Sequence, residues 1–216
     1  MTKHLLIRMG LAIALGPVCG YAVDGQILIN QSTVMSAGGF PYIISQPGSY
    51  KLSGNLVATT GASAIQIGAN NVIVDLNGFN VSCAAQQPII MRCVTDAGTG
   101  GFQNIEVGNG TVSVSLVPGG TPPPGFNFNY GVDFSRSMTV YLHDVFVLGF
   151  QSFSLGYGWG GITVGYQSRL DRNTASLFEI YCPSIYVENI TTGGGGLAGG
   201  SGCVGANNLG FSGLVP

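Results

Sequence analysis

The chain has 216 residues, of which 7% are charged and 45% are hydrophobic, and 36 are glycines. So few charged residues, together with so many apolar residues, exclude a disordered chain, because disordered chains are highly charged and poor in apolar residues. The seven Lys and Arg residues are scattered, so we expect no nucleic-acid partner, because such binding needs clustered basic residues. The composition instead predicts an all-β, turn-rich protein.

Residues 1–22 have the features of a secretory signal peptide. Lys3 and Arg8 supply the positive start, and an apolar stretch covers residues 11–18. Ala22 is the small residue after which cleavage is expected. A membrane anchor is the alternative, but the apolar run is well short of the ~20 residues that a spanning helix needs. We therefore expect a secreted or periplasmic protein whose mature chain has no transmembrane segment.

Cleavage after residue 22 takes away two of the seven basic residues, which leaves five basic and nine acidic residues and a net charge of −4. It also removes Cys19, where lipid attachment is the alternative, although residues 16–18 match a lipoprotein signal poorly. An even number of cysteines in an oxidising compartment predicts two disulfides. Of the three possible connectivities we prefer the most local one, Cys83–Cys93 with Cys182–Cys203.

Zinc binding by these cysteines is the competing interpretation. The mature chain has no Cys-x-x-Cys pair, and its only histidine is His143. Structural zinc sites need four ligands of these two kinds. We therefore expect no metal site and no cofactor.

Four segments share one sequence pattern, in which a small polar residue is followed by alternating apolar positions. The alternation includes β-branched residues, which predicts strands. The segments start 33, 33 and 47 residues apart. A short strand that recurs in this way can stack ~4.8 Å from its equivalent in the preceding winding. The apolar pairs predicted to face inward are Val72/Val74, Ile105/Val107, Met138/Val140 and Ile185/Val187.

This stacking predicts a solenoid in which each winding contacts only its neighbours. The long spacings imply loops, and we expect them at residues 119–125 and 156–165, the second of which contains Trp159. We interpret the charged residues 169–172 as an ion-pair patch on an exposed loop. Asn71 and Asn104 are expected to hydrogen-bond the backbone at corners of the windings.

A resemblance to a known family lies in three stretches: ISQPGSYKLSGNL at residues 44–56, AIQI at 64–67 and NNVIVDLNGF at 70–79. They resemble the opening windings of bacterial secreted right-handed parallel β-helix repeat proteins, and the likeness extends over about residues 24–115. The resemblance implies the fold. It implies no single activity, because the family includes polysaccharide lyases, glycosidases and members without known chemistry.

The expected organisation is therefore a signal peptide at 1–22, a parallel β-helix domain at 23–192 and a glycine-rich segment at 193–216. Short strands at 27–30 and 41–45 are expected to cap the first end of the stack. For the glycine-rich segment two interpretations stay open, a disordered tail and an irregular final coil pinned by Cys203.

The stacked windings also predict a group of binding residues on the outer face. Alternate residues of a strand face opposite sides, so one register for all four segments places Tyr141 beside Glu188. Tyr186 and His143 lie close by in this arrangement, and Asp144 follows on the turn. Aromatic faces pack on sugar rings, and a carboxylate accepts hydrogen bonds from hydroxyls. The alternative is that tyrosines are ordinary strand residues and that Glu188 is merely solvated.

The predicted function is a secreted, non-catalytic protein that binds carbohydrate or a cell-surface partner. The alternative is a polysaccharide lyase or glycoside hydrolase on the same scaffold. A hydrolase needs two carboxylates across a cleft, and a lyase needs calcium-binding aspartates with a base. No two acidic residues lie in adjacent positions of one predicted strand, so we assign no catalytic residue. A structural or adhesive piece of a larger surface assembly is the third hypothesis.

Overall fold

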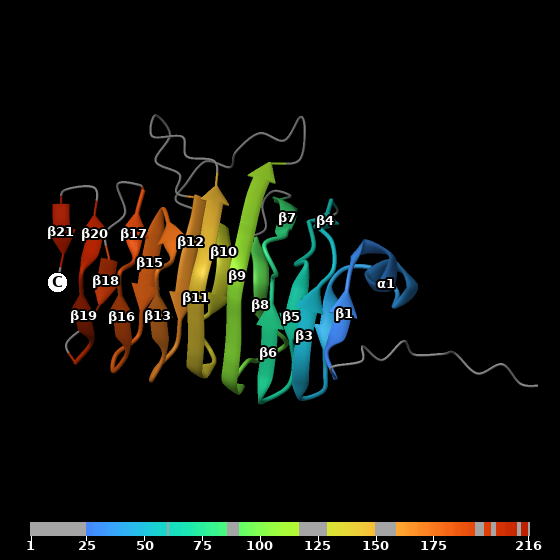
Figure 1. Cartoon of the computed structure of the whole chain (residues 1–216), viewed down its shortest axis with the longest axis horizontal. Helices are drawn as coiled ribbons and strands as arrows, with labels where there is room; N and C mark the ends of the chain where they lie inside the picture. The colour runs from blue at the N-terminus through green and yellow to red at the C-terminus, as the bar shows by residue number, and fades with distance from the viewer. Residues whose placement is uncertain are drawn as a thin grey trace, which may run out of the picture.

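The structure is a computed structural model that describes residues 25–59, 61–85, 91–116, 129–149, 159–192, 197–199, 202–210 and 213–215. These residues form two β-sheets and one short helix, α1 (Gln31–Ser36). Both sheets extend along the long axis of the molecule, with the N-terminal strands at one end and the C-terminal strands at the other (Figure 1). The all-β prediction is confirmed for the described residues.

The larger sheet has 14 described strands. They are β1 (Ile27–Ile29), β3 (Gly48–Leu52), β4 (Leu56–Ala58), β6 (Val72–Asp75), β7 (Asn80–Ala85), β9 (Gln103–Leu116), β11 (Met138–Gly149), β13 (Arg169–Asp171), β14 (Thr174–Ala175), β16 (Ile185–Val187), β17 (Ile190–Thr191), β19 (Val204–Ala206), β20 (Asn208–Gly210) and β21 (Gly213–Val215). The smaller sheet has seven described strands. They are β2 (Tyr42–Ile44), β5 (Ile65–Ile67), β8 (Arg92–Asp96), β10 (Asn129–Phe134), β12 (Trp159–Val164), β15 (Leu177–Ile180) and β18 (Leu197–Gly199).

The chain visits the two sheets alternately. After β3 and β4 in the larger sheet it forms β5 in the smaller sheet, and it then returns to the larger sheet with β6 and β7. Each return places a strand beside and parallel to its predecessor, and among the described strands only β20 and β21 pair in the antiparallel sense. Parallel neighbours require a crossover connection, and here strands of the opposite sheet lie on that crossover.

A continuous apolar row lies behind the larger sheet. Successive inward positions pair in register from β6 to β16, and each of these side chains is at most 9% exposed. Burial of apolar side chains is the main stabilising term in a fold of this kind. The row consists of Val74, Val107, Leu142, Leu170 and Tyr186.

The register predicted from the sequence is wrong in its second half. Val140 pairs with Ile105, so Leu142 takes the place beside Val107 that we expected for Val140. In β16 the inward residue is Tyr186, and the predicted inward pair Ile185 and Val187 faces outward, with Ile185 45% exposed. A shift of one residue moves every side chain of a strand to the other face.

The sequence pattern also conceals one whole winding, so that β16 is not a direct neighbour of β11. The 47-residue spacing contains two windings, because β13 lies between β11 and β16. In β13 a single apolar residue, Leu170, stands between Arg169 and Asp171, so the segment lacks the apolar alternation of a strand. The interpretation of this segment as an exposed loop is therefore wrong.

The ends of the stack agree in part with expectation. The predicted strands at 27–30 and 41–45 are present as β1 and β2, each the first strand of its sheet. Between them the sequence analysis missed α1, whose N-cap Asn30 accepts a hydrogen bond from Thr33 N at 3.0 Å.

The signal peptide at 1–22 and the loop at 119–125 lie outside the described residues. The loop expected at 156–165 is wrong for Trp159–Val164, which form β12.

Most of the described residues of the glycine-rich C-terminal segment form strands, namely β18 to β21. Both disulfides of the preferred connectivity are present, Cys83–Cys93 and Cys182–Cys203. The first joins β7 of the larger sheet to β8 of the smaller sheet, and the second ties the segment before β16 to the segment before β19. Within the described part of the chain, no helix has the length and apolar character needed to cross a membrane.

A ladder of buried asparagines connects the last windings. Asn173, Asn189 and Asn208 are each 0% exposed. Asn173 Nδ2 donates to Asn189 Oδ1 at 3.0 Å, and Asn189 Nδ2 donates to Asn208 Oδ1 at 3.3 Å. Asn173 Oδ1 also accepts from Val145 N within β11, and Asn189 Oδ1 accepts from Asn173 N just before β14. The ladder therefore satisfies buried backbone groups that the short strands leave unpaired.

Candidate functional site

The predicted binding residues lie on the outer face of the larger sheet, but their neighbours differ from those expected. Tyr141 pairs with Glu106 of β9 on one side and with Arg169 of β13 on the other. His143 pairs with Gly108 and with Asp171 in the same two strands. The structure therefore places charged residues of β13 where the sequence analysis expected Glu188.

Two of the five predicted residues do not join this face of the sheet. Tyr186 points inward, opposite Leu170, and is 9% exposed. Glu188 is exposed at the turn after β16, with a φ of 55°. The one-residue register error in β16 turns Tyr186 toward the core, and the concealed winding separates β16 from β11 by one strand. The predicted juxtaposition of Tyr141 with Tyr186 and Glu188 is wrong.

His143 stands between two carboxylates. Its Nδ1 lies 2.9 Å from Asp144 Oδ2, and its Nε2 lies 3.4 Å from Glu106 Oε1. Arg172 donates to both oxygens of Asp144, from Nε at 2.7 Å and from Nη2 at 2.6 Å. These hydrogen bonds from Arg172, with a smaller contribution from His143, lower the pKa of Asp144 to about 2. Asp144 is consequently an ionised anchor for Arg172 and His143 at neutral pH.

A second group of contacts surrounds Tyr141. Its hydroxyl donates to Asp171 Oδ2 at 3.3 Å, and Arg169 Nε donates to the same oxygen at 2.7 Å. The Arg169 guanidinium lies 5.5 Å from the centroid of the Tyr141 ring, and the His143 ring lies 4.6 Å away. Burial, followed by the charge of Asp171, raises the pKa of Tyr141. Tyr141 is therefore a neutral, fixed aromatic side chain.

Beside Tyr141 the outer face is hollowed by about 320 Å³. We call this the tyrosine hollow. Ile73, 44% exposed, supplies apolar surface, and the Glu106 side chain, 40% exposed, supplies a carboxylate. The partly exposed lining residues are Asn71, Ile73, Asn104, Glu106, Thr139 and Tyr141.

One edge of the tyrosine hollow is a ladder of turn residues. Asn71, Asn104 and Thr139 precede their strands with φ values of 57°, 56° and 54°. Asn104 Nδ2 donates to Asn71 Oδ1 at 2.9 Å, and Thr139 Oγ1 donates to Asn104 Oδ1 at 3.1 Å. The corner position expected for the two asparagines is confirmed, but the hydrogen bonds that their side chains make among the described residues join side chains of successive windings and not the backbone. The ladder fixes the amides along the rim of the hollow.

The sequence analysis missed most of the charged partners at this face, namely Glu106, Arg169, Asp171 and Arg172. The closely spaced Arg169, Asp171 and Arg172 were the available signal, but the segment did not look like a strand.

Among the described residues no group of three His, Cys, Asp or Glu side chains is arranged to hold a metal ion. Comparisons with family models, curated proteins and solved structures return no match for this chain.

Proposed function

We propose that this chain is an exported right-handed parallel β-helix protein that binds carbohydrate, without chemical turnover, on the outer face of its larger sheet. The alternation of the chain between two parallel sheets supports a β-helix. Export is supported by the signal-like residues 1–22 and by the two disulfides, which persist in oxidising compartments.

The tyrosine hollow is the observation that carries this proposal. A sugar presents apolar C–H faces and a rim of hydroxyls, so a binding site combines exposed apolar surface with fixed polar groups. Ile73 and Tyr141 supply the apolar surface, and the carboxylate of Glu106 supplies a hydrogen-bond acceptor. The ladder of turn residues, Asn71, Asn104 and Thr139, holds its amides at the rim before any ligand binds. This preorganisation lowers the entropic cost of binding.

Binding is favoured over turnover by the state of the neighbouring carboxylates. A general acid for glycosidic cleavage needs a raised pKa, whereas Arg172 and His143 lower the pKa of Asp144 to about 2. Asp171 accepts hydrogen bonds from Arg169 and Tyr141 through one oxygen. These two acids are engaged in positioning their neighbours.

The test is a polysaccharide panel probed with the protein purified after export, followed by calorimetry on any polysaccharide that is retained. Tyr141→Ala should weaken binding at least tenfold, because it removes the aromatic wall of the tyrosine hollow. Phe146→Ala is the matched control, since Phe146 is an aromatic residue of the same strand, 42% exposed, in a different row. Its affinity should stay within twofold of the parent.

Three results would overturn the proposal. They are no retention on any polysaccharide, equal losses in the two variants, and release of reducing ends or unsaturated products. The last result would instead establish the lyase or hydrolase alternative.

A further inference from the structure

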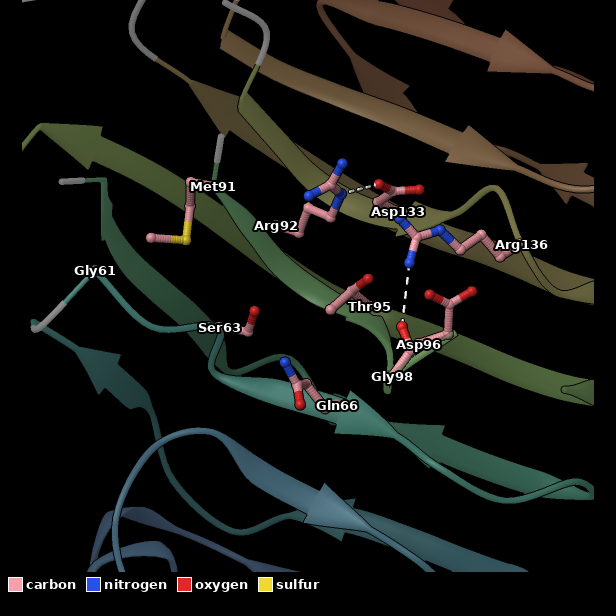
Figure 2. A pocket seen from close by; sticks show the side chains of 10 residues that line it. All are labelled: Gly61, Ser63, Gln66, Met91, Arg92, Thr95, Asp96, Gly98, Asp133 and Arg136. Carbon is pink, nitrogen blue, oxygen red and sulfur yellow. Dashed lines mark hydrogen bonds and ion pairs between the residues drawn. The ribbon is translucent and has the colours of Figure 1, made fainter. Parts of the chain in front are cut away.

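A second hollow lies on the smaller sheet, away from the residues of the tyrosine hollow. It has a volume of about 210 Å³ and is lined from β5, β8, β10 and the segments that flank them. Figure 2 shows Arg92 and Arg136 reaching into it from neighbouring parts of the chain. We call it the arginine pocket.

Sheet register brings the polar groups of this pocket together. Gln66, Thr95 and Asp133 occupy one row across β5, β8 and β10. Neighbouring strands lie ~4.8 Å apart, so these three side chains form a short polar row across the sheet. Arg92 projects from the same face of β8 as Thr95, three residues earlier in the chain.

Asp133 holds Arg92 in place. Arg92 Nε pairs with Asp133 Oδ2, and Asp133 Oδ1 accepts a hydrogen bond from Ser135 N at 3.0 Å. Asp133 is 4% exposed, so both of its oxygens are committed inside the protein. The terminal nitrogens of Arg92 have no hydrogen-bond partner among the described residues, and the Arg92 side chain is 37% exposed. A guanidinium fixed through Nε with its terminal nitrogens free is oriented to receive an oxyanion.

Arg136 supplies a second cation. Its Nη1 donates to Gly98 O at 3.1 Å, and within the described part of the chain it forms no ion pair. Gly100 approaches it so closely that an added Cβ would lie 2.3 Å from Arg136 Cβ. The main chain of this segment therefore confines the stem of Arg136 at the edge of the pocket.

The fourth charged group of the pocket is Asp96, which is 8% exposed and accepts a hydrogen bond from Ser137 Oγ at 2.9 Å. Burial, with a contribution from the charge of Asp133, raises the pKa of Asp96. The two guanidinium groups therefore lie beside Asp133, which pairs with Arg92, and Asp96, whose charge is disfavoured by its surroundings. Arg136 has no ion-pair partner among the described residues, so its charge is available to an anion.

Thr95 provides independent evidence that this pocket is built for a ligand. The residue is 4% exposed and lines the pocket, and its hydroxyl has no hydrogen-bond partner in the described structure. The hydroxyl is therefore available to pair with a ligand in the pocket. Ser63 and Gln66 add two further polar side chains that make no hydrogen bond within the described residues.

We propose that the arginine pocket binds a sugar acid, with the ligand's carboxylate on Arg92 and Arg136 and its hydroxyls on Thr95, Ser63 and Gln66. Two guanidinium groups match one carboxylate, and the neutral polar groups beside them match hydroxyls. The volume is below the ~300–1,000 Å³ of drug-sized ligand sites, which fits a single sugar unit. The site is separate from the tyrosine hollow and does not depend on it.

The test is calorimetry with four probes: galacturonate, galactose, acetate and inorganic phosphate. Galacturonate should bind, while the other three should bind at least tenfold more weakly, because galactose lacks the carboxylate and acetate and phosphate lack the hydroxyls. Arg136→Gln should reduce galacturonate affinity at least tenfold. Lys51→Gln makes the same change of charge on the larger sheet, where Lys51 pairs with Asp75 at 3.4 Å, and should leave the affinity unchanged.

Thr95→Val tests the same pocket through a second measurement. The variant should bind galacturonate several-fold more weakly, yet unfold at a temperature equal to or higher than the parent, because it replaces an unpaired hydroxyl with a methyl group. Tyr141→Ala should retain full galacturonate binding, which separates this site from the proposed function. Equal binding of galactose, acetate or phosphate would overturn the proposal, as would the absence of galacturonate binding or equal effects of Arg136→Gln and Lys51→Gln.

Discussion

His143 occupies the outer face of the larger sheet because its partner in the next strand, Gly108, has no side chain. An added Cβ at Gly108 would lie 2.3 Å from His143 Cε1, well inside van der Waals contact. The glycine therefore makes room for the imidazole ring between Glu106 and Asp144. No periodic pattern in the sequence indicates this role, because the pairing of Gly108 with His143 depends on the register of β9 and β11.

Gly108→Ala is expected to displace His143 and to break its contacts with the two carboxylates. Overpacking of this kind costs about 1–3 kcal/mol, which denaturant unfolding would detect. The NMR signals of the His143 ring should shift as well. Gly54→Ala is the control, since its added Cβ would meet only Asn30 Cβ at 3.7 Å. A Gly108→Ala protein with the stability and ring signals of the parent would contradict the packing described.

The ion pair between Asp144 and Arg172 predicts a defined pH dependence of stability. The pKa of Asp144 falls from 3.8 to about 2 on folding, so the folded state favours the ionised form. This contribution is fully present above pH 3.8 and is lost as the pH falls toward 2. Arg172 is exposed, and solvent screening keeps the effect small.

Acid unfolding of the parent and of Asp144→Asn would measure this contribution, and the variant should lose less stability between pH 3.8 and 2. Arg172→Gln should behave in the same way. The double variant should show no additional loss, because both changes remove one interaction. Additive effects of the two substitutions would contradict a shared ion pair.

At the scale of the element, the short strands of the last windings depend on the buried asparagine ladder. β13, β14, β16 and β17 contain two or three residues each, so many of their flanking backbone groups lie at bends. Asn189 contacts both neighbouring windings, since its Oδ1 accepts from Asn173 N at 2.9 Å and its Nδ2 donates to Asn208 Oδ1 at 3.3 Å. The strand pattern predicts the aliphatic core, but it carries no information about a polar ladder that forms only when windings stack.

Asn189→Ala should lower the free energy of unfolding by about 2–4 kcal/mol, because it leaves at least two buried polar groups without partners. Chemical denaturation at neutral pH is the measurement. Gln103→Ala serves as the control, since the Gln103 side chain is exposed and makes no hydrogen bond within the described structure. Its effect should be within about 0.5 kcal/mol. Equal stability of Asn189→Ala and the parent would mean that the ladder contributes nothing.

The element scale also explains how far sequence reasoning could go. The residues 71–75 and 104–107 have clear apolar alternation, and their strands and mutual register are as predicted. The pairing of the four cysteines followed correctly from proximity along the chain. The segment Arg169–Asp171 could not be recognised, because a buried winding needs only one inward apolar residue when its neighbours on either side supply the rest of the row.

For the whole molecule, that one concealed strand decides which residues share a surface. With β13 in place, Tyr141 faces Arg169 and Asp171, and the predicted partners Tyr186 and Glu188 belong to the next winding. Three of the five predicted site residues, Tyr141, His143 and Asp144, do lie together in the structure. These three residues could be predicted together because they lie along one strand. Their contact partners could not, because those depend on the register between strands that are far apart in the sequence.

Stacking of the windings in this register is therefore the central claim, because both proposed binding sites are assembled by it. The most direct test is oxidative cross-linking of paired cysteine variants, analysed by mass spectrometry of non-reduced peptides. Directly paired residues of neighbouring strands lie ~4.8 Å apart, which is within the Cα separation that a disulfide spans. Tyr141→Cys combined with Arg169→Cys should cross-link within the monomer, while Tyr141→Cys combined with Glu188→Cys should not. The reverse outcome would contradict the account.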